Sequence, residues 1–189
     1  IPAMYRGKKI VGTGDKMQLS PFDLYKVRWE EDLDENTDPS LEVDSLLDLT
    51  SQHLMQVQLR GHYRSQSMDL IEFSNQHFYH GNLTLLPDKN ILEERRPAIE
   101  FIKINGIWDN QINENEAMKV VDLVEKLLKS HADKEIGIVS FNAKQQDFIL
   151  DQLENRSVAN EFTIPESLFV KNIENVQGDE RDIIIFSIG

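Results

Sequence analysis

The sequence contains no cysteine among its 189 residues. This excludes disulfide bonds, zinc sites with cysteine ligands and thiol nucleophiles, and it agrees with a reducing compartment. No run of about 18 apolar residues is present, and the first residues, Ile1–Arg6, lack the basic-then-apolar layout of a signal peptide. We therefore expect a cytoplasmic protein with no membrane partner.

Positive charge is also scarce, because 20 Lys and Arg stand against 33 Asp and Glu and leave a formal net charge of -13. Nucleic-acid binding normally relies on Lys and Arg to neutralise phosphates, so any such contact must be local. Much of the negative charge lies between Glu30 and Asp48, and the stretch Trp29–Pro39 is typical of a solvated acidic loop. That loop is the best candidate for an internal boundary.

No metal site is predicted, although two patterns resemble one. Residues 32–38 imitate the first half of a calcium loop, but Thr37 replaces the required Gly and Val43 replaces the bidentate Glu. His77 and His80 share a helix face without a third ligand nearby. We interpret the first pattern as part of the acidic loop and the two histidines as helix-end or packing residues.

The sequence does contain short β-branched runs that alternate with helical patterns, and its 40% of hydrophobic residues suffices for a buried core. This alternation predicts an α/β fold in which crossover helices connect the strands of a parallel sheet. The expected strands are Lys9–Thr13, Met55–Leu59, Ile99–Ile104, Ile136–Ser140, Leu168–Lys171 and Ile183–Ile188.

Three helices are expected between these strands. The clearest is Glu114–Lys129, where Asn113 and Glu116 suit a capping box. A second helix starts near Ser67 and runs toward His80, and a third follows Asn142, with Gln145 reaching back from its first turn. The apolar stripe of the first helix is expected to be core and comprises Ala117, Val120, Val121, Val124, Leu127 and Leu128.

Three turns that follow expected strands carry polar side chains, and ligands bind at the carboxyl ends of strands in open parallel sheets. The first turn, Gly12–Pro21, presents Asp15, Lys16 and the neutral amide of Gln18. An amide there can hydrogen-bond a phosphate without adding charge, as a γ-phosphate sensor must. Taken alone, the two glycines of this turn fit a plain strand-to-loop connection equally well.

The other two turns offer charge and aromatic surface. In Leu59–Ser65, Arg64 is placed where its guanidinium can reach a phosphate, and Tyr63 offers a flat face to a base. The alternative is a surface Arg beside a half-buried Tyr. In Val170–Asp182, acidic residues could hold a ribose hydroxyl and amides could contact a nucleic-acid backbone, whereas an ordinary charged hairpin is the alternative.

Together these segments resemble the superfamily 1 helicases of the nonsense-mediated-decay and Dna-two-like branch. Four motifs occur in order: Gly14–Pro21 resembles motif III, with Ser20 where Pro is usual, His62–Ser65 the arginine-finger motif, Ile136–Gln145 the next strand-turn motif, and Gln177–Asp182 motif V. Leu70–Tyr79 and Glu174–Asp182 are also similar to a bacterial subgroup of large, multi-domain helicase-related proteins.

The resemblance implies a RecA-like fold of the P-loop NTPase type and a role for each matching residue. Gln18 would sense the γ-phosphate and Arg64 would stabilise its transition-state charge, so these are the expected catalytic residues. The residues expected to bind the nucleotide are Asp15, Tyr63 near the adenine, and Gly178 and Glu180 at the ribose and phosphates. The residues expected along a single strand of DNA or RNA are Ser140, Phe141, Asn142, Asn172, Asn175 and Gln177.

The resemblance also implies a division of the chain. Residues 1–21 would end a first RecA-like domain, residues 22–50 would form an acidic linker, and residues 51–189 would be a second RecA-like domain, truncated before its last motif. The sequence begins without Met and stops within the apolar run Ile183–Gly189, so we expect both ends to be cut.

Two parts of a complete motor are not found in the sequence, a Gly-x-x-x-x-Gly-Lys-Ser/Thr loop and the acidic Mg-binding motif that should precede motif III. In the full-length protein, ATP and Mg²⁺ would therefore bind between this domain and a preceding RecA-like domain of the same chain. We expect the fragment alone to bind no cofactor, hydrolyse no ATP and unwind no nucleic acid.

Two alternatives to a helicase motor stay open. One is a degenerate RecA-like module that binds a protein partner through its acidic loop, which the matching Arg64, Gln18 and Glu180 disfavour. The other is an ATP-driven translocase that remodels protein–nucleic-acid complexes without unwinding, and the sequence does not separate it from a helicase.

Overall fold

The computed structural model describes residues 6–18, 45–65, 67–85, 97–159 and 162–189. The chain divides into two compact units, Ile1–Phe101 and Ile102–Gly189, and each is described by itself. This boundary falls inside the segment 51–189 that the sequence assigns to one domain, and the assignment of residues 1–21, 22–50 and 51–189 stays a prediction. Residues 32–38, with their calcium-like pattern, lie outside the described residues.

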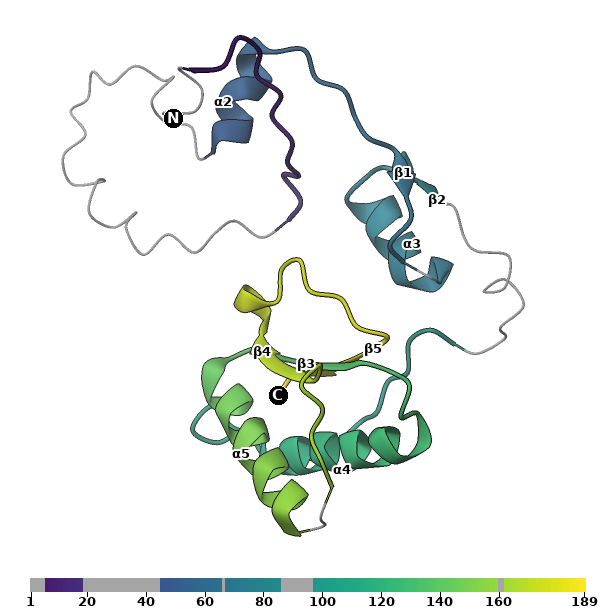
Figure 1. The fold of residues 1–189 in the computed structure, drawn as a ribbon, viewed down its shortest axis with the longest axis vertical. Helices are drawn as coiled ribbons and strands as arrows, with labels where there is room; N and C mark the ends of the chain where they lie inside the picture. Colours follow the sequence, from purple (N-terminus) through teal and green to yellow (C-terminus); the bar gives the residue numbers. More distant parts are fainter. Residues whose placement is uncertain (1–5, 19–44, 66, 86–96, 160–161) are drawn as a thin grey trace, which may run out of the picture. The chain divides into compact units, whose positions relative to one another are not determined.

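The second unit is built on a three-stranded parallel sheet in the order β4-β3-β5 (Figure 1). The central strand, β3 (Ile136–Ser140), pairs with β4 (Phe169–Asn172) on one side and with β5 (Ile183–Ser187) on the other. All five residues of β3 are buried, as expected for an apolar strand with a neighbour on both edges. The α/β fold with a parallel sheet is therefore confirmed.

Two helices, α4 (Glu114–Ser130) and α5 (Ala143–Ala159), cover one face of this sheet (Figure 1). Alternation along β5 identifies the covered face, because Ile185 and Ser187 are buried whereas Ile184 and Phe186 are exposed. The core between helices and sheet consists of Ala117, Val120, Val121, Val124, Ile136, Ile138, Ile149, Leu153 and Ile185. The four helix positions from Ala117 to Val124 belong to the predicted apolar stripe.

A glycine in β3 permits close packing on the opposite face. A Cβ at Gly137 would lie 2.4 Å from Cζ of Phe169 and 2.9 Å from Cδ1 of Ile184, which is closer than side chains approach. Gly137 pairs in register with both of these residues. The ring of Phe169 therefore occupies space that any larger residue at position 137 would need.

The first unit contains two short helices and a two-stranded sheet. Helix α2 (Leu46–His53) is capped by Ser45, and helix α3 (Met68–His77) is capped by Ser67. Strand β1 (Gly61–His62) pairs in parallel with β2 (Thr84–Leu85). The crossover through α3 returns over a turn in which the buried Asn75 accepts a hydrogen bond from the backbone N–H of Leu83 at 3.0 Å.

Most predicted elements of the second unit are confirmed. Three predicted strands, two in the first unit and one across the boundary between the units, are wrong. Lys9–Thr13, Met55–Leu59 and Ile99–Ile104 form no strand in the structure. Their apolar side chains lie in solvent, with Val11 88%, Met55 91% and Phe101 80% exposed. A β-branched run becomes a strand only when a neighbouring strand completes its hydrogen bonds, and no such neighbour lies beside these runs among the described residues.

Helix α2 was not predicted, and it spans the predicted boundary between the acidic segment 22–50 and the segment 51–189. None of the helices in the described part of the chain is long and apolar enough to cross a bilayer.

Candidate functional site

Three strand ends lie in one row at the carboxyl edge of the sheet in the second unit. Ser140, the last residue of β3, pairs in register with Asn172 of β4 and with Ser187 of β5. Neighbouring strands are about 4.8 Å apart, so this row of three polar residues is roughly 10 Å long. Because the strands are parallel, the turns that follow them begin at the same edge, which is where ligands bind in such sheets.

A buried glutamine fixes this edge from below. Gln145 in the first turn of α5 is only 1% exposed. Its Oε1 accepts from the backbone N–H of Asn113 at 2.8 Å, while its Nε2 donates to the Asn113 carbonyl at 3.2 Å and to Oγ of Ser187 at 3.1 Å. The side chain therefore joins the start of α4, the start of α5 and the end of β5.

Glu116 completes the same network at the start of α4. Its carboxylate accepts from Oγ of Ser187 at 2.7 Å and from the backbone N–H of Gly189 at 3.1 and 3.2 Å. Asn113 caps the helix, with its Oδ1 accepting from the N–H of Glu116 at 3.1 Å. The predicted cap is confirmed, but the Asn113 N–H bonds to Gln145 rather than to the Glu116 side chain that a capping box would use. Hereafter, Asn113, Glu116, Gln145 and Ser187 are called the edge network.

The turn after β3 contains three predicted track residues. Ser140 is buried and donates through Oγ to the carbonyl of Asn142 at 2.9 Å, and Oδ1 of Asn142 accepts from the N–H of Gln145 at 2.9 Å. Both polar side chains therefore shape the turn. Phe141 between them is 49% exposed, with its ring centroid 6.5 Å from that of Phe186. Of the three, Phe141 presents the surface on which a base could stack.

The turn after β4 contains the remaining predicted residues of this unit. Asn172 caps the short 3-10 helix η5 (Ile173–Asn175), with Oδ1 accepting from the N–H groups of Glu174 at 3.1 Å and Asn175 at 3.2 Å. Asn175, Gln177, Gly178 and Glu180 follow along this exposed turn. Gly178 has a φ of +91°, a conformation that favours glycine.

Two cations fasten this turn to β4. Lys171 forms an ion pair with Asp179 at 2.5 Å. Arg181 donates to the carbonyl of Ser167 at 2.7 Å, and its guanidinium lies 5.0 Å from the centroid of the Phe169 ring. The part of the turn that includes Gly178 and Glu180 is therefore held to β4 and to Ser167 through Asp179 and Arg181.

In the first unit, the structure joins two of the predicted nucleotide-site residues. Oδ2 of Asp15 accepts from Nε2 of Gln18 at 3.3 Å and from the hydroxyl of Tyr79 at 2.6 Å, and Oδ1 accepts from the N–H of Met17 at 2.9 Å. Partial burial alone would raise the pKa of Asp15, but these hydrogen bonds outweigh it and lower the pKa below its usual value. Tyr79 lies in the stretch Leu70–Tyr79 that resembles bacterial helicase-related proteins, but its contact with Asp15, 64 residues away in the sequence, was not predicted.

The predicted arginine-finger turn lies between β1 and α3. Tyr63 and Arg64 are exposed there, and the N–H of Ser65 donates to Nε2 of His62 at 3.1 Å. This bond closes the turn around Arg64.

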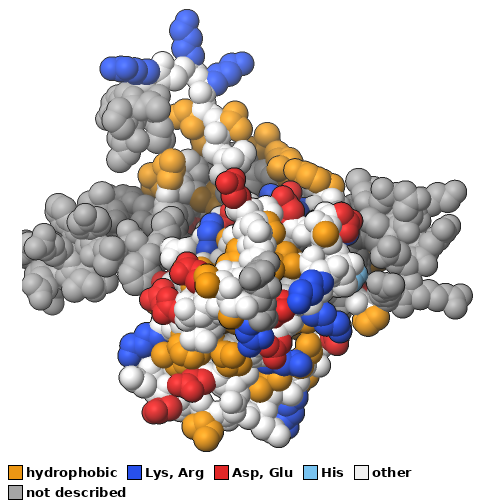
Figure 2. Space-filling view, turned by 60° about the horizontal axis from the view of Figure 1, so that its bottom comes forward, with side chains coloured by type: hydrophobic (Ala, Val, Ile, Leu, Met, Phe, Trp, Pro, Cys, Tyr) orange, Lys and Arg blue, Asp and Glu red, His pale blue; other side chains and the backbone are white. Residues whose placement is uncertain are grey.

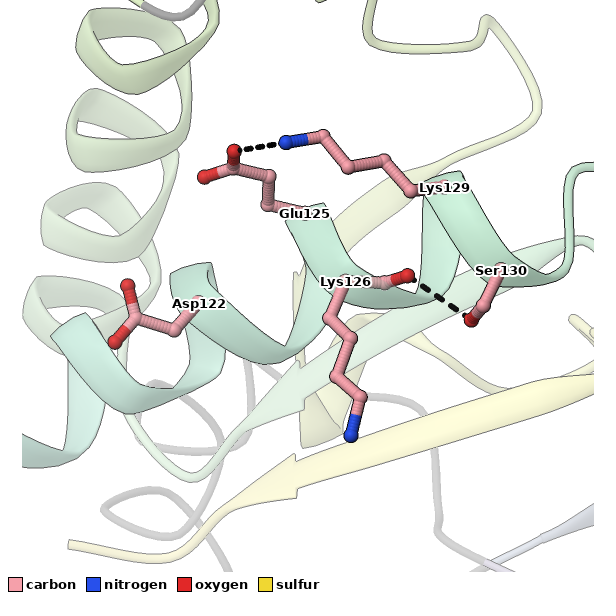
Figure 3. Close-up of a pocket in the computed structure, with 5 residues that line it drawn as sticks. All are labelled: Asp122, Glu125, Lys126, Lys129 and Ser130. Atoms are coloured by element: carbon pink, nitrogen blue, oxygen red, sulfur yellow. Dashed lines mark hydrogen bonds and ion pairs between the residues drawn. The ribbon is translucent and has the colours of Figure 1, made fainter.

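A hollow elsewhere in the second unit is unrelated to these residues. It has a volume of about 450 Å³ and is lined by Asp122, Glu125, Lys126, Lys129 and Ser130, all from α4 (Figure 3). Lys129 pairs with Glu125 at 2.6 Å, and Arg156 of α5 pairs with Asp122 at 2.9 Å. Because one exposed helix side forms the hollow and its charges are largely matched, we do not place the site there.

The charge distribution and the metal-ligating residues limit the chemistry. On the face shown in Figure 2, acidic and basic side chains of the described residues are interspersed and no continuous stripe of Lys and Arg crosses it. Within the described part of the chain, no group of three or more His, Asp or Glu side chains is arranged to hold a metal ion.

Comparisons with known proteins agree with the motifs. A family model described as an AAA domain matches residues 42–189. The chain is 38% identical over 205 residues to a Mycoplasma genitalium protein named as an uncharacterized ATP-dependent helicase, and 37% identical over 205 residues to a homolog from Mycoplasma pneumoniae. Each alignment covers 100% of this chain and 18% of the relative, so the chain spans less than a fifth of the length of these proteins.

Proposed function

Because this chain belongs to the AAA domain family, we propose that it is the second RecA-like motor domain of an ATP-dependent helicase or translocase. The family match over residues 42–189 confirms the resemblance to superfamily 1 helicases, while the branch within that superfamily stays a prediction. The two Mycoplasma relatives, named as ATP-dependent helicases, support the same activity for the full-length protein.

The observation that carries the proposal is the aligned carboxyl edge of the sheet in the second unit. Ser140, Asn172 and Ser187 end their strands in one row, and the edge network fixes that row from below. Polar turns with one exposed ring at such an edge suit contacts to a single strand that do not depend on its sequence. We therefore assign the turn after β3, with Phe141, and the turn after β4, with Asn175 and Gln177, to the strand track.

The nucleotide would be contacted from two further turns, which carry Gln18 and Arg64, and from the turn after β4. Arg64 would bring its guanidinium to the γ-phosphate and stabilise the charge that develops on the equatorial oxygens during transfer. The neutral amide of Gln18 would hydrogen-bond the same phosphate and report its presence. Gly178 permits close backbone approach to the nucleotide and Glu180 would accept from a ribose hydroxyl. When bound, ATP supplies the phosphoryl group that is transferred to water, and its hydrolysis would end the closed state of the two motor domains.

The first experiment measures ATP hydrolysis by the full-length protein with and without single-stranded DNA and RNA. Wild type should be stimulated by at least one polymer, and Arg64→Ala should lower the stimulated rate by about 10³-fold or more, as loss of an arginine finger does. Arg156→Ala is the matched control, because Arg156 pairs with Asp122 and Glu125 on the helices of the second unit. That variant should keep the wild-type rate.

Two results would contradict the proposal. A full-length wild type with no turnover on either polymer would favour the degenerate interaction module. Equal rates for Arg64→Ala and Arg156→Ala would remove the arginine-finger role while leaving a motor. A strand-displacement assay on the active wild type then distinguishes a helicase from a translocase that does not unwind.

A further inference from the structure

The residues 14–18, here called the sensor loop, are fastened by one carboxylate. Asp15 accepts hydrogen bonds from the backbone N–H of Met17 at 2.9 Å and the amide of Gln18 at 3.3 Å, both within the loop. Its third donor is the hydroxyl of Tyr79, at 2.6 Å and 64 residues further along the chain. The shortest of the three bonds is therefore the one that reaches outside the loop.

Tyr79 is bound to α3, the helix that follows the Arg64 turn in the sequence. The backbone N–H groups of Phe78 and Tyr79 both donate to the carbonyl of Ser74, at 2.9 and 3.3 Å, so Tyr79 is bound to the last turn of α3. At its other end, α3 begins after its cap Ser67, three positions beyond Arg64. Its ten residues span about 15 Å at 1.5 Å per residue. One short helix thus joins the finger turn to the donor on Asp15.

The sensor loop is held from a second side by α2. Lys16 pairs with Asp48 at 2.5 Å and donates to Oγ of Ser51 at 3.4 Å. A Cβ at Gly14 would lie 3.0 Å from Cδ2 of Leu47, so the loop backbone runs close to the helix. With Lys16 bonded to α2 and Asp15 bonded to Tyr79, the loop has two anchors shortly before Gln18.

Two donors share the same oxygen of Asp15, and their distances differ. Tyr79 donates to Oδ2 at 2.6 Å, whereas Gln18 lies at 3.3 Å from it, near the limit for a hydrogen bond. The strong bond to Tyr79 keeps the carboxylate in place, and the carboxylate in turn holds the Gln18 amide beside it.

We propose that Tyr79 is a positioning residue, which through Asp15 positions the sensor loop and its Gln18 relative to α3 in the closed state of the motor. This inference rests on the proposed function, in which Gln18 and Arg64 meet the same γ-phosphate. The hydroxyl of Tyr79 couples α3 to the sensor loop in that state.

The test compares full-length wild type with Tyr79→Phe, which keeps the ring and removes the hydroxyl. We expect kcat for nucleic-acid-stimulated ATP hydrolysis to fall by about tenfold, the size of effect that loss of one hydrogen bond to a charged acceptor produces. The KM for ATP should change by less than about twofold, because the loop is positioned for the transition state rather than for binding. Ser130→Ala, which removes a hydroxyl bonded to the Lys126 carbonyl on α4, is the control and should match wild type.

Hydrogen exchange of the same full-length proteins gives a readout that is independent of turnover. In Tyr79→Phe, peptides covering residues 14–18 should exchange faster, while those covering α4 and α5 should be unchanged. Asp15→Ala should abolish the difference between Tyr and Phe at position 79, because each single change breaks the same bond.

The outcomes separate the two proposals. Unchanged exchange at residues 14–18 in Tyr79→Phe overturns the contact, and faster exchange with a wild-type kcat overturns the positioning role. A tenfold fall in kcat with an unchanged KM and faster exchange supports it. Absence of turnover in the wild type would instead overturn the proposed function, and the positioning role with it.

Discussion

The hydrogen bond between Asp15 and Tyr79 favours the ionised form of Asp15 and the neutral form of Tyr79. The hydrogen bond to Asp15, with added contributions from burial and from the negative charge of Asp15, raises the pKa of Tyr79 to about 12. Burial of Asp15 opposes ionisation, but its hydrogen bonds from Tyr79, Met17 and Gln18 lower its pKa below 3.8. The pair therefore consists of a neutral tyrosine and an ionised carboxylate through the whole physiological range.

We predict that the contribution of this pair to the free energy of unfolding depends on pH in two ranges, one alkaline and one acidic. The folded pKa of Tyr79 exceeds the ordinary tyrosine value of about 10, so its contribution is complete below about pH 10 and is lost as pH rises toward 12. The folded pKa of Asp15 is below 3.8, so its contribution is present above pH 3.8 and is lost as pH falls through the folded value. Tyrosinate absorbance of the chain, which has four tyrosines, measures the alkaline limb.

Asp15→Asn provides the comparison for this titration. The wild type should show one tyrosine with a pKa of about 12, and the variant should lose this late component because Tyr79 no longer has a hydrogen bond to an ionised carboxylate. Superimposable alkaline titrations of the two proteins would contradict the prediction.

Phe141 is the residue at the carboxyl edge that tests the strand track. Replacing it with Ala in the full-length protein should weaken binding of a single-stranded oligonucleotide by about 1–3 kcal/mol, the usual contribution of one base stacked on an aromatic ring. Fluorescence anisotropy with a labelled oligonucleotide measures the change. Phe101→Ala removes a ring that is 80% exposed in the first unit and should leave the affinity unchanged. Equal losses in both variants would argue against stacking at Phe141.

At the scale of elements, the edge network connects α4, α5 and β5 through one side chain. Gln145→Leu would leave the N–H of Asn113 without its acceptor in a buried place. Each unsatisfied buried polar group costs about 1–3 kcal/mol, so we predict destabilisation of about 2–4 kcal/mol. Denaturant unfolding measures it.

Gln146→Leu is the matched control for this prediction. It makes the same substitution one position further along α5, where the side chain is half-buried. The control should change the free energy of unfolding by less than about 1 kcal/mol. A similar loss in both variants would mean that helix propensity or burial, rather than the edge network, determines the effect.

Elements that carry their own local signals could be predicted from the sequence. Helix α4 was found from its apolar stripe and Asn113, α3 from Ser67, and β3 from a β-branched run that lies inside a complete sheet. The runs Lys9–Thr13, Met55–Leu59 and Ile99–Ile104 have the same composition but lack a partner strand among the described residues. Strand formation depends on that partner, which local sequence does not specify.

The site residues divide in the same way. Phe141, Asn142 and Asn172 were assigned from the resemblance to helicase motifs, and the register shows that the turns after β3 and β4 begin at one edge of the sheet. Their role in binding stays a prediction. Tyr79 and Ser187 were missed because their partners lie 64 and 42 residues away in the sequence. The prediction that the Gln145 side chain reaches back over the first turn of its own helix was wrong, since its amide bonds to Asn113 and Ser187 instead.

At the scale of the whole molecule, the net charge of -13 bears on the proposed function. If the chain binds nucleic acid as proposed, repulsion between a phosphate backbone and most of this acidic surface would confine a strand to turns that offer amides and a ring. The chain spans 18% of the length of its Mycoplasma relatives.

We predict that the 189-residue chain alone does not hydrolyse ATP. Its sequence contains Arg64 but no Gly-x-x-x-x-Gly-Lys-Ser/Thr loop to hold the phosphates. Phosphate release should stay at background with or without single-stranded DNA, while the full-length protein serves as the positive control. Stimulated turnover by the isolated chain would show that our division of labour between the two motor domains is wrong.

The edge network has a fixed direction of proton donation. The backbone N–H of Asn113 can only donate, so it determines which end of the Gln145 amide faces it. The other end must then donate to Ser187, and the hydroxyl of Ser187, already an acceptor, must donate onward to Glu116. The N–H of Asn113 thus determines the orientation of the Gln145 amide and of the Ser187 hydroxyl, which donates to the Glu116 carboxylate. Asn113, the N-cap of α4, therefore determines in which direction the hydroxyl of Ser187 at the end of β5 donates its hydrogen bond.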